Sequence, residues 1–272
     1  MTVNGKVAWI TGASSGIGAA LAREWSRRGG FVVLSGRDQS RLADVARGLS
    51  AESLILPFDV RDDAALGHAT REALAWKGGV DLAVANAGIS QRSTALETDM
   101  RVYREIIEVD LIAQIAFAQS LIGPMTERGS GALAFISSIA GKVGVPMRTA
   151  YSAAKFGLAG YADALRGELS QSGVSVHAIY PGSIRTDVSR NALTADGRPR
   201  GRSDKVIDEG IEPDVAAGEM LDAVAAGARE IIVAQGGEKA MGELRRTPDA
   251  LFDQVAGMVA AGYMERMKGD EA

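Results

Sequence analysis

The sequence of 272 residues contains no cysteine and only two histidines, His68 and His177. The absence of cysteine excludes disulfides, thiolate metal sites and thiol nucleophiles, and it is compatible with a reducing cytoplasm. Two histidines argue against a histidine-based metal cluster, so we expect no metal site. The net charge of −4 lacks the basic excess typical of nucleic-acid-binding proteins, so we expect no nucleic-acid partner.

Long apolar runs are missing as well. No segment approaches the roughly 18–20 apolar residues that a membrane helix needs, and the stretch Met1–Lys6 has no apolar run typical of a signal peptide. We therefore expect a cytoplasmic protein without a membrane anchor. Hydrophobic residues make up 46% of the chain and charged residues 24%, which is ordinary for a globular protein. The length suits a single α/β domain, residues 1–272, with a large core.

Short apolar runs alternate with longer segments of helical periodicity along most of the chain. This alternation predicts an α/β fold with a doubly wound parallel sheet and helices on both faces, a Rossmann fold. The expected strands are Val7–Thr11, Phe31–Ser35, Ser53–Phe58, Leu82–Ala85, Ala132–Ser137, Val174–Tyr180 and Ile231–Ala234. The expected helices are Gly16–Arg28, Gln39–Leu49, Asp62–Trp76, Asp99–Thr126, which Pro124 is expected to bend or end, and about 150–172.

Two segments depart from this alternation. Residues 183–210 are rich in Arg, Asp, Gly and Ser, and loops of this length are usually lids, so we expect a substrate loop at 185–210. Residues 236–272 form a C-terminal extension in which Pro248–Met267 has helical periodicity. We expect this extra helix to pack on its own core or on a partner subunit rather than on a membrane.

A glycine-rich turn, Thr11–Gly18, connects the first expected strand to the first helix. Its G-x3-G-x-G spacing differs from the commoner G-x-G-x-x-G and from a phosphate loop, and a purely structural turn is the alternative. Glycines allow a sharp turn and let a pyrophosphate approach the backbone. The start of the helix offers unpaired N–H groups and a positive dipole end. The position of the turn after the first strand favours a dinucleotide site.

The second expected strand is followed by Gly36-Arg37-Asp38. An acidic residue at this place would bind the ribose 2′-hydroxyl of NAD, whereas an arginine accommodates the 2′-phosphate of NADP. The guanidinium of Arg37 can bind a phosphate through two hydrogen bonds, so the sequence favours NADP over NAD. The alternatives are a solvated Arg37 and an Asp38 that serves the ribose.

Tyr151 and Lys155 lie four residues apart at the start of an expected helix and therefore share one helical face. A tyrosine phenol ordinarily keeps its proton up to about pH 10, so it needs a nearby cation to transfer protons at neutral pH. An ammonium at about 4 Å, in an effective dielectric of about 20, contributes on the order of 4 kcal/mol toward the phenolate. Such pairs also arise by chance, but Ser138 ends the preceding strand, where its hydroxyl could hold a substrate oxygen beside Tyr151.

In this combination and order, the motifs resemble those of the short-chain dehydrogenase/reductases, from Lys6 to about Ala234. The resemblance implies that Ser138, Tyr151 and Lys155 are catalytic, and that Tyr151 and Lys155 also contact the cofactor. Asp59 would reach the adenine, and Ile184 and Thr186 would hold the carboxamide. The implied cofactor contacts are Gly12, Ser14, Ser15, Gly16, Ile17, Gly18, Asp59, Val60, Asn86, Ala87, Gly88, Pro181, Gly182, Ile184 and Thr186, beside Arg37.

The chain departs from the family pattern at Val109-Asp110, where the family usually has a catalytic asparagine after the valine. An ionised Asp can accept hydrogen bonds but cannot donate through its side chain. We expect Asp110 to be a fourth member of the catalytic group, and it could pair with Lys155 and compete for its charge. The segment at 210–214 and the C-terminal extension are similar to the branch of steroid- and lipid-type carbonyl reductases.

The sequence thus predicts an oxidoreductase that interconverts a secondary alcohol and a carbonyl with NADP(H) as the cofactor. The Tyr–Lys spacing of four is narrower than is usual for enoyl reductases. Candidate substrate contacts, beside Ser138 and Tyr151, are Gln91, Met147 and Arg148, with a solvated role as the commoner one for such an arginine. The resemblance implies a homodimer or homotetramer. The alternative, suggested by Asp110, is a cofactor-binding sensor or scaffold with little turnover.

Overall fold

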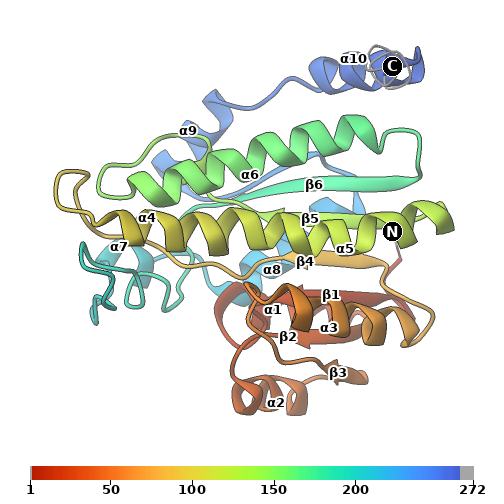
Figure 1. The fold of residues 1–272 in the computed structure, drawn as a ribbon, viewed down its shortest axis with the longest axis horizontal. Coiled ribbons are helices and arrows are strands. Elements are labelled where there is room, and N and C mark those ends of the chain that lie inside the picture. The colour runs from red at the N-terminus through yellow and green to blue at the C-terminus, as the bar shows by residue number, and fades with distance from the viewer. Residues whose placement is uncertain (1, 264–272) are drawn as a thin grey trace.

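The computed structural model describes residues 2–263 and forms one sheet of seven parallel strands. The strand order is β3-β2-β1-β4-β5-β6-β7, which confirms the predicted doubly wound α/β fold (Figure 1). The strands are β1 (Val7–Thr11), β2 (Phe31–Ser35), β3 (Ser53–Ile55), β4 (Leu82–Ala85), β5 (Gly131–Ile136), β6 (Val174–Pro181) and β7 (Glu230–Val233).

The centre of the sheet is β1, which pairs with β2 on one side and with β4 on the other. The chain runs outward from β1 to β3, returns, and then continues outward from β4 to β7. The order therefore reverses between β1 and β4, and ligands of open α/β sheets bind at the carboxyl ends of the strands beside such a reversal.

Helices cover both faces of the sheet because its strands are buried on both sides. On one face lie α3 (Asp63–Ala75), α5 (Ala113–Arg128) and α6 (Thr149–Glu168). On the other lie α1 (Gly16–Arg27), α2 (Gln39–Arg47) and α8 (Pro213–Ala225).

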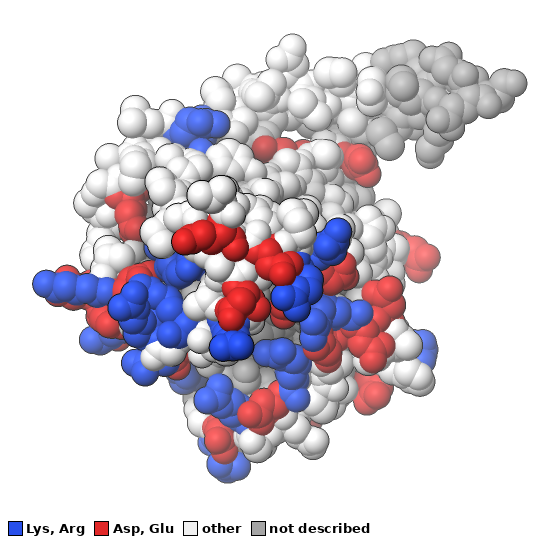
Figure 2. Space-filling view, turned by 60° about the vertical axis from the view of Figure 1, so that its left-hand side comes forward, with Lys and Arg blue, Asp and Glu red and all other residues white. Residues whose placement is uncertain are grey.

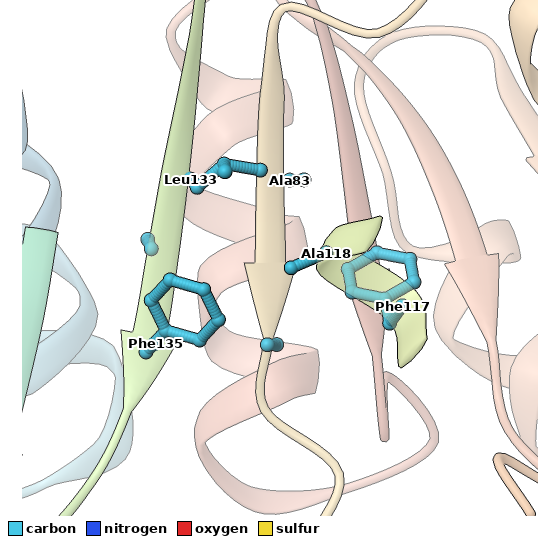
Figure 3. Close-up of a pocket in the computed structure, with 7 residues that line it drawn as sticks. Ala83, Phe117, Ala118, Leu133 and Phe135 are labelled. Carbon is cyan, nitrogen blue, oxygen red and sulfur yellow. The ribbon is translucent and has the colours of Figure 1, made fainter. Parts of the chain in front are cut away.

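Apolar packing against β4 and β5 is drawn in Figure 3. Phe117 and Ala118 of α5 lie against Ala83 of β4 and against Leu133 and Phe135 of β5. Each of these five residues is at most 3% exposed, so the small void that they line belongs to the hydrophobic core and not to a ligand site.

A π-helical turn interrupts the long helix that the sequence predicted over Asp99–Thr126. The helix α4 (Met100–Ile107) passes through η1 (Glu108–Ile112) into α5. Pro124 lies inside α5, which continues to Arg128, so it does not end the helix there. Sequence periodicity did not reveal the π turn, a feature that is frequent at functional sites.

The helix formed by Met100–Arg128 is long and apolar enough to cross a membrane, so the expectation that no segment has this character was wrong. Several of its apolar side chains pack in the core beside the sheet, since Phe117, Leu121 and Met125 are at most 1% exposed. Core helices of proteins without membrane contacts share this composition.

The third strand is shorter than predicted because Pro57 has no N–H for the ladder. The chain nevertheless keeps its course, since Leu56 N–H donates to Leu34 O at 3.0 Å and Phe58 N–H donates to Gly36 O at 3.0 Å. The other strand ends agree with the predicted ones to within one residue.

The expected substrate loop lies against the segment that follows β4. Leu193 pairs with Gln91 in an isolated bridge, and the loop contains one short helix, α7 (Lys205–Asp208). Figure 1 shows α7 near the start of α4.

The C-terminal extension contains α9 (Gly236–Leu244) and α10 (Asp249–Ala260). Phe252 of α10 lies against α6, with the guanidinium of Arg166 4.3 Å from its ring centre. The predicted helix Pro248–Met267 is thus present over its first part, and its end from residue 264 lies outside the described residues.

A buried ion pair ties the extension to the sheet. Lys142 Nζ donates to Glu230 Oε1 at 2.7 Å and to Arg245 O at 3.0 Å, and Thr247 N–H donates to Glu230 Oε2 at 2.8 Å. The side chains of Lys142 and Glu230 are only 4% and 2% exposed, so all their charge is balanced within the protein.

We predict that His177 makes the stability of the protein depend on pH. Burial lowers the pKa of His177, whose Nδ1 lies 2.7 Å from Ala228 O. A depressed folded-state pKa means that the neutral ring contributes stability above about pH 6.5, and that this contribution is lost as the pH falls. The slope is at most about 1.4 kcal/mol per pH unit. Denaturant unfolding between pH 7 and 5.5 should therefore show a smaller loss in His177→Asn than in the wild type.

The matched control is His68→Asn, because His68 is exposed on α3. It should retain the wild-type slope. Equal slopes in His177→Asn and the wild type would contradict the prediction.

Candidate active site

The glycine-rich turn lies at the carboxyl end of β1 and is held against the end of β4. Asn86 Nδ2 donates to Thr11 O at 2.8 Å, and Asn86 N–H donates to Thr11 Oγ1 at 3.0 Å. Gly12 has φ +65°, and a Cβ on Gly18 would lie 2.3 Å from Gly12 O. Any side chain at Gly18 would therefore collide with the backbone of the turn, which explains the glycine in physical terms.

The start of α1 has open donors. Its N-cap, Ser15, makes no side-chain capping bond, so the first N–H groups of the helix have no side-chain acceptor at this place. A helix start of this kind binds phosphate through N–H groups and the helix dipole. Gly16 faces Thr186, whose Cγ2 would lie 3.1 Å from a Cβ at position 16. The turn and the segment after β6 thus meet, and together they fit a dinucleotide whose pyrophosphate lies on α1.

Arg37 and Asp38 differ in what they already contact. Asp38 caps α2, because its Oδ1 accepts from Arg41 N–H at 3.1 Å and from Ser40 Oγ at 2.7 Å. Its hydrogen bond from Ser40 lowers the pKa of Asp38, with a smaller contribution from Arg41 N–H. Arg37 is exposed and makes no hydrogen bond or close ion pair within residues 2–263.

Asp59 lies within electrostatic reach of Arg37 and is held by a close partner. Arg61 donates to Asp59 through Nε at 3.0 Å and Nη2 at 2.7 Å. These hydrogen bonds outweigh burial and lower the pKa of Asp59 to about 2, with a small contribution from the charge of Arg37. Asp59 is therefore ionised at neutral pH. The next residue, Val60, is half-buried beside it.

Ser138, Tyr151 and Lys155 are brought to one edge of the sheet by two elements. Ser138 follows β5 and caps the short 3-10 helix η2 (Ile139–Gly141), where its Oγ accepts from Ala140 N–H at 3.1 Å. Tyr151 and Lys155 lie in the first turns of α6, and Lys155 Nζ lies 5.6 Å from the centre of the Tyr151 ring. Ser137 Oγ donates to Lys155 O at 3.0 Å and links the two elements.

Close packing holds η2 against α6. A Cβ on Gly141 would lie 2.7 Å from Lys155 O and 2.4 Å from Ser137 Oγ, so only glycine fits. The hydroxyl of Tyr151 makes no hydrogen bond within the described part of the chain. This leaves it free to bind a substrate oxygen.

Asp110 of the π turn η1 pairs with Lys155, as its position suggested. Its Oδ2 lies 3.1 Å from Lys155 Nζ, and its Oδ1 accepts from Ile89 N–H at 2.8 Å. Lys155 Nζ also donates to Ile136 O at 3.0 Å. Gly88 permits this pair, because a Cβ there would lie 3.0 Å from Asp110 Oδ2.

The ion pair between Asp110 and Lys155 is almost entirely removed from solvent, with side chains 0% and 4% exposed. Burial raises the pKa of Asp110, against the opposing influence of Lys155. Burial alone would lower the pKa of Lys155, but the combined influence of Asp110 and Tyr151 raises that pKa above its ordinary value. Lys155 therefore stays a cation at neutral pH, and its charge is partly balanced by Asp110.

The structure corrects the prediction that Gln91 contacts the substrate. Gln91 is fully buried, and its Nε2 donates to Ser93 Oγ at 3.1 Å and to Thr98 Oγ1 at 3.0 Å. Its Oε1 accepts from Ala150 N–H at 2.9 Å. All the polar atoms of this amide are thus used to hold the start of α6 against the loop after β4.

Met147 and Arg148 immediately precede α6. Met147 is 50% exposed and has φ +63°, a conformation that is uncommon outside glycine and that is often found at functional sites. The side chain of Arg148 is only 24% exposed, so Arg148 is not the fully solvated arginine that the sequence favoured.

The segment after β6 is held by a residue that the sequence analysis missed. Glu238 of α9 accepts from Ser183 N–H at 2.7 Å and from Ser183 Oγ at 2.9 Å. A Cβ on Gly182 would lie 2.4 Å from Glu238 Oε2. Glu238 thus positions the Pro181–Ser183 segment, and Ile184 is buried so that only its backbone can face a ligand. No motif in the C-terminal extension signals this contact.

Comparison with known families gives an independent view of this site. Residues 6–197 match the family described as short chain dehydrogenase. The chain is 34% identical over 262 residues to dehydrogenase/reductase SDR family member 7B of Danio rerio, covering 93% of this chain and 85% of the relative. It is also 34% identical to dehydrogenase/reductase SDR family protein 7-like of Drosophila melanogaster, covering 91% of this chain and 78% of the relative.

Solved structures share the fold. A short-chain dehydrogenase/reductase from Burkholderia phymatum in complex with NAD has a TM-score of 0.78 at 21% identity, covering 85% of this chain and 90% of that one. A serine dehydrogenase complexed with NADP+ has a TM-score of 0.77 at 22% identity, covering 84% of this chain and 94% of that one.

We predict that Asp110→Ala destabilises the protein by about 3–5 kcal/mol, because it leaves the Lys155 ammonium buried without its counter-charge. Asp110→Asn retains an acceptor for Ile89 N–H and should cost less. Chemical denaturation of the apoprotein measures both losses. The control is Asp214→Ala, which removes an exposed pair with Arg23 and should change the unfolding midpoint little. Equal effects of Asp110→Ala and Asp214→Ala would show that the buried pair is unimportant for stability.

Proposed function

The chain belongs to the short-chain dehydrogenase/reductase family and is an NAD(P)-dependent oxidoreductase, and from this premise we propose that it interconverts a secondary alcohol and a ketone with NADP(H). The observation that carries the proposal is the arrangement of Ser138, Tyr151 and Lys155 at the strand ends beside the glycine-rich turn. A phenol, a hydroxyl and a cation there face the place where a dinucleotide fits.

In the reductive direction, a reduced nicotinamide held between the glycine-rich turn and the segment after β6 would supply a hydride, that is, one proton with two electrons, to the carbonyl carbon. Tyr151 donates its phenolic proton to the carbonyl oxygen, so that the C=O bond becomes a C–OH bond. Ser138 holds the same oxygen by a hydrogen bond from its hydroxyl. Its Oγ lies 3.5 Å from Pro181 O, a contact long enough for the hydroxyl to turn toward a substrate.

Lys155 favours the phenolate that Tyr151 leaves behind, because its ammonium lies over the same ring. Burial and the contact with Ile136 O fix the ammonium in place, so that no reorganisation is needed when the proton moves. The Asp110 carboxyl group, 3.1 Å from the ammonium, offsets part of this charge. In the oxidative direction the same groups act in reverse.

The preference for NADP rests on the contrast between Arg37 and Asp38. The Asp38 oxygen that caps α2 is engaged, whereas Arg37 is exposed and free to bind an anion at the end of β2. A guanidinium at this place matches the charge and the geometry of a 2′-phosphate.

We predict that Arg37→Ala weakens NADPH binding about 10- to 100-fold, since it removes charged hydrogen bonds of about 1.5–3 kcal/mol, and that it leaves NADH binding nearly unchanged. Fluorescence titration with both cofactors measures this. Arg47→Ala, on the last turn of the helix α2 that follows Arg37 and Asp38, is the control and should change neither affinity. An Arg37→Ala protein with unchanged preference for NADPH would refute the cofactor assignment.

We predict that Tyr151→Phe lowers turnover of carbonyl substrates by at least about 100-fold while NADPH still binds, because a general acid contributes roughly 100- to 10,000-fold. NADPH oxidation with a panel of ketones and aldehydes is the assay. Tyr161→Phe, ten residues later on α6, is the matched control and should keep full activity. Full turnover in Tyr151→Phe would remove the proposed acid.

A sensor or scaffold with little turnover is the second candidate, and the neutralising Asp110–Lys155 pair is the observation that favours it. NADPH binding without turnover of any alcohol or carbonyl in the panel would support this candidate over the oxidoreductase.

A further inference from the structure

Three arginine side chains converge on one carboxylate beside the proposed active site. Arg92 Nε donates to Asp204 Oδ2 at 2.7 Å, and Arg200 Nη1 forms an ion pair with Asp204 Oδ1. Arg148 Nη2 lies 3.7 Å from Asp204 Oδ2. We call these four residues the arginine cluster. It joins the loop after β4, the start of α6 and the expected substrate loop.

The side of the molecule that carries α7 and the start of α4 comes forward in Figure 2. Lys and Arg side chains gather there among Asp and Glu side chains over the lower part of the face. The arginine cluster belongs to this side by its elements, since Asp204 directly precedes α7.

Arg148 differs from the other two arginines in having no close partner. Arg92 also donates to Ser90 Oγ at 2.9 Å and to Gln91 O at 2.7 Å. Arg148 donates no side-chain hydrogen bond within residues 2–263, and its one ion contact is longer than a hydrogen bond. A guanidinium carries five N–H donors in a planar fork, so that of Arg148 is available to a ligand.

The surroundings of Arg148 are costly for a cation whose nearest carboxylate oxygen lies 3.7 Å away. Its side chain is only 24% exposed. Burial lowers the pKa of Arg148, and the charge of Arg92 lowers it further. Hydrogen bonds from Arg200 and Arg92 outweigh burial and keep the pKa of Asp204 below its ordinary value, so one carboxylate faces three guanidinium groups. Glu238 is the other acid within electrostatic reach, and it is engaged by Ser183.

Arg148 also lies close to the proposed acid. It is the N-cap of α6, three residues before Tyr151, and the two side chains interact electrostatically. Arg148 and the proposed acid therefore lie at the same end of α6.

Resting on the proposed function, we propose that the substrate carries a compact anionic group, a carboxylate or a phosphate, that Arg148 binds through its free N–H groups. Arg92, Arg200 and Asp204 position this arginine: Asp204 is held by the other two and balances only one of the three positive charges. The planar fork of Arg148 suits two parallel hydrogen bonds to a carboxylate or a phosphate. The cluster thus selects charged over neutral carbonyl compounds of the same skeleton.

The test compares matched pairs of carbonyl compounds with NADPH. Acetoacetate and methyl acetoacetate form the carboxylate pair, and hydroxyacetone phosphate and hydroxyacetone form the phosphate pair. We predict that kcat/KM for at least one anionic member exceeds that of its neutral partner by about 100-fold, because a site built to bind a charged group rejects the analogue that lacks it. Which pair shows the larger ratio identifies the anion.

Arg148→Met should lower kcat/KM for the preferred anionic compound by about 100-fold and leave that for its neutral partner within about threefold. Arg148→Lys should recover part of the loss, since it restores the charge but not the fork. Arg198→Met is the matched control in the expected substrate loop, because Arg198 is exposed and its side chain, among the described residues, pairs only with Asp196. It should behave as the wild type. Two results together would overturn the proposal and leave the oxidoreductase assignment intact. The first is equal kcat/KM for the neutral and the anionic compounds, and the second is equal kcat/KM values in Arg148→Met and Arg198→Met.

A binding measurement tests the site without turnover. Calorimetric titration of the NADP+-saturated protein with acetoacetate and with inorganic phosphate should show binding of one of them that Arg148→Met abolishes and Arg198→Met retains. If no carbonyl is turned over but this pattern is found, the anion site stands and the proposed reaction fails. Binding that is absent in the wild type, or equal in both variants, overturns the anion site.

Discussion

The carboxyl edge of the sheet depends on one buried contact, the ion pair between Lys155 of α6 and Asp110 of the π turn. Burying two charges is costly unless each has its counter-charge and hydrogen bonds. Ile136 O accepts from Lys155 and Ile89 N–H donates to Asp110 Oδ1, whereas Asp110 Oδ2 has only the nearby ammonium. The pair therefore fixes the relative position of β5, α6, the loop after β4 and the middle of the long helix. It also keeps the Lys155 ammonium over the Tyr151 ring, and the proposed proton transfer depends on this cation.

Close backbone approach is the second constraint on this edge. Gly18 and Gly88 stand where a Cβ would lie 3.0 Å or less from a polar atom of the turn or of the ion pair, so that the backbone of the turn and the Asp110–Lys155 pair are closely packed. The C-terminal extension adds to the same edge from outside the family motifs. Glu238 holds the segment after β6, and the Lys142–Glu230 pair fastens the extension to the sheet.

Much of the fold followed from local patterns, and the errors have physical causes. Alternating strand and helix periods predicted the sheet, because parallel strands must be covered on both faces. Pro57 shortened β3 through its missing N–H, and the π turn at Asp110 escaped detection because a single extra residue does not alter helical periodicity enough to be recognised. Gln91 was misassigned, since a glutamine in a loop has no sequence signal that tells a buried amide from one that faces a ligand.

The sequence by itself determined the class of fold and the family, because periodicity along the chain and the spacing of short motifs are local properties, and it also predicted Ser138, Tyr151 and Lys155 as the catalytic group. Only the tertiary structure decided which charges meet. Arg92, Arg148 and Arg200 come from three separate segments, and their convergence on Asp204 depends on how the loops pack. Electrostatic interactions depend on the distance between charges and on their burial, and the order of the amino acids gives neither for residues that are remote in the chain.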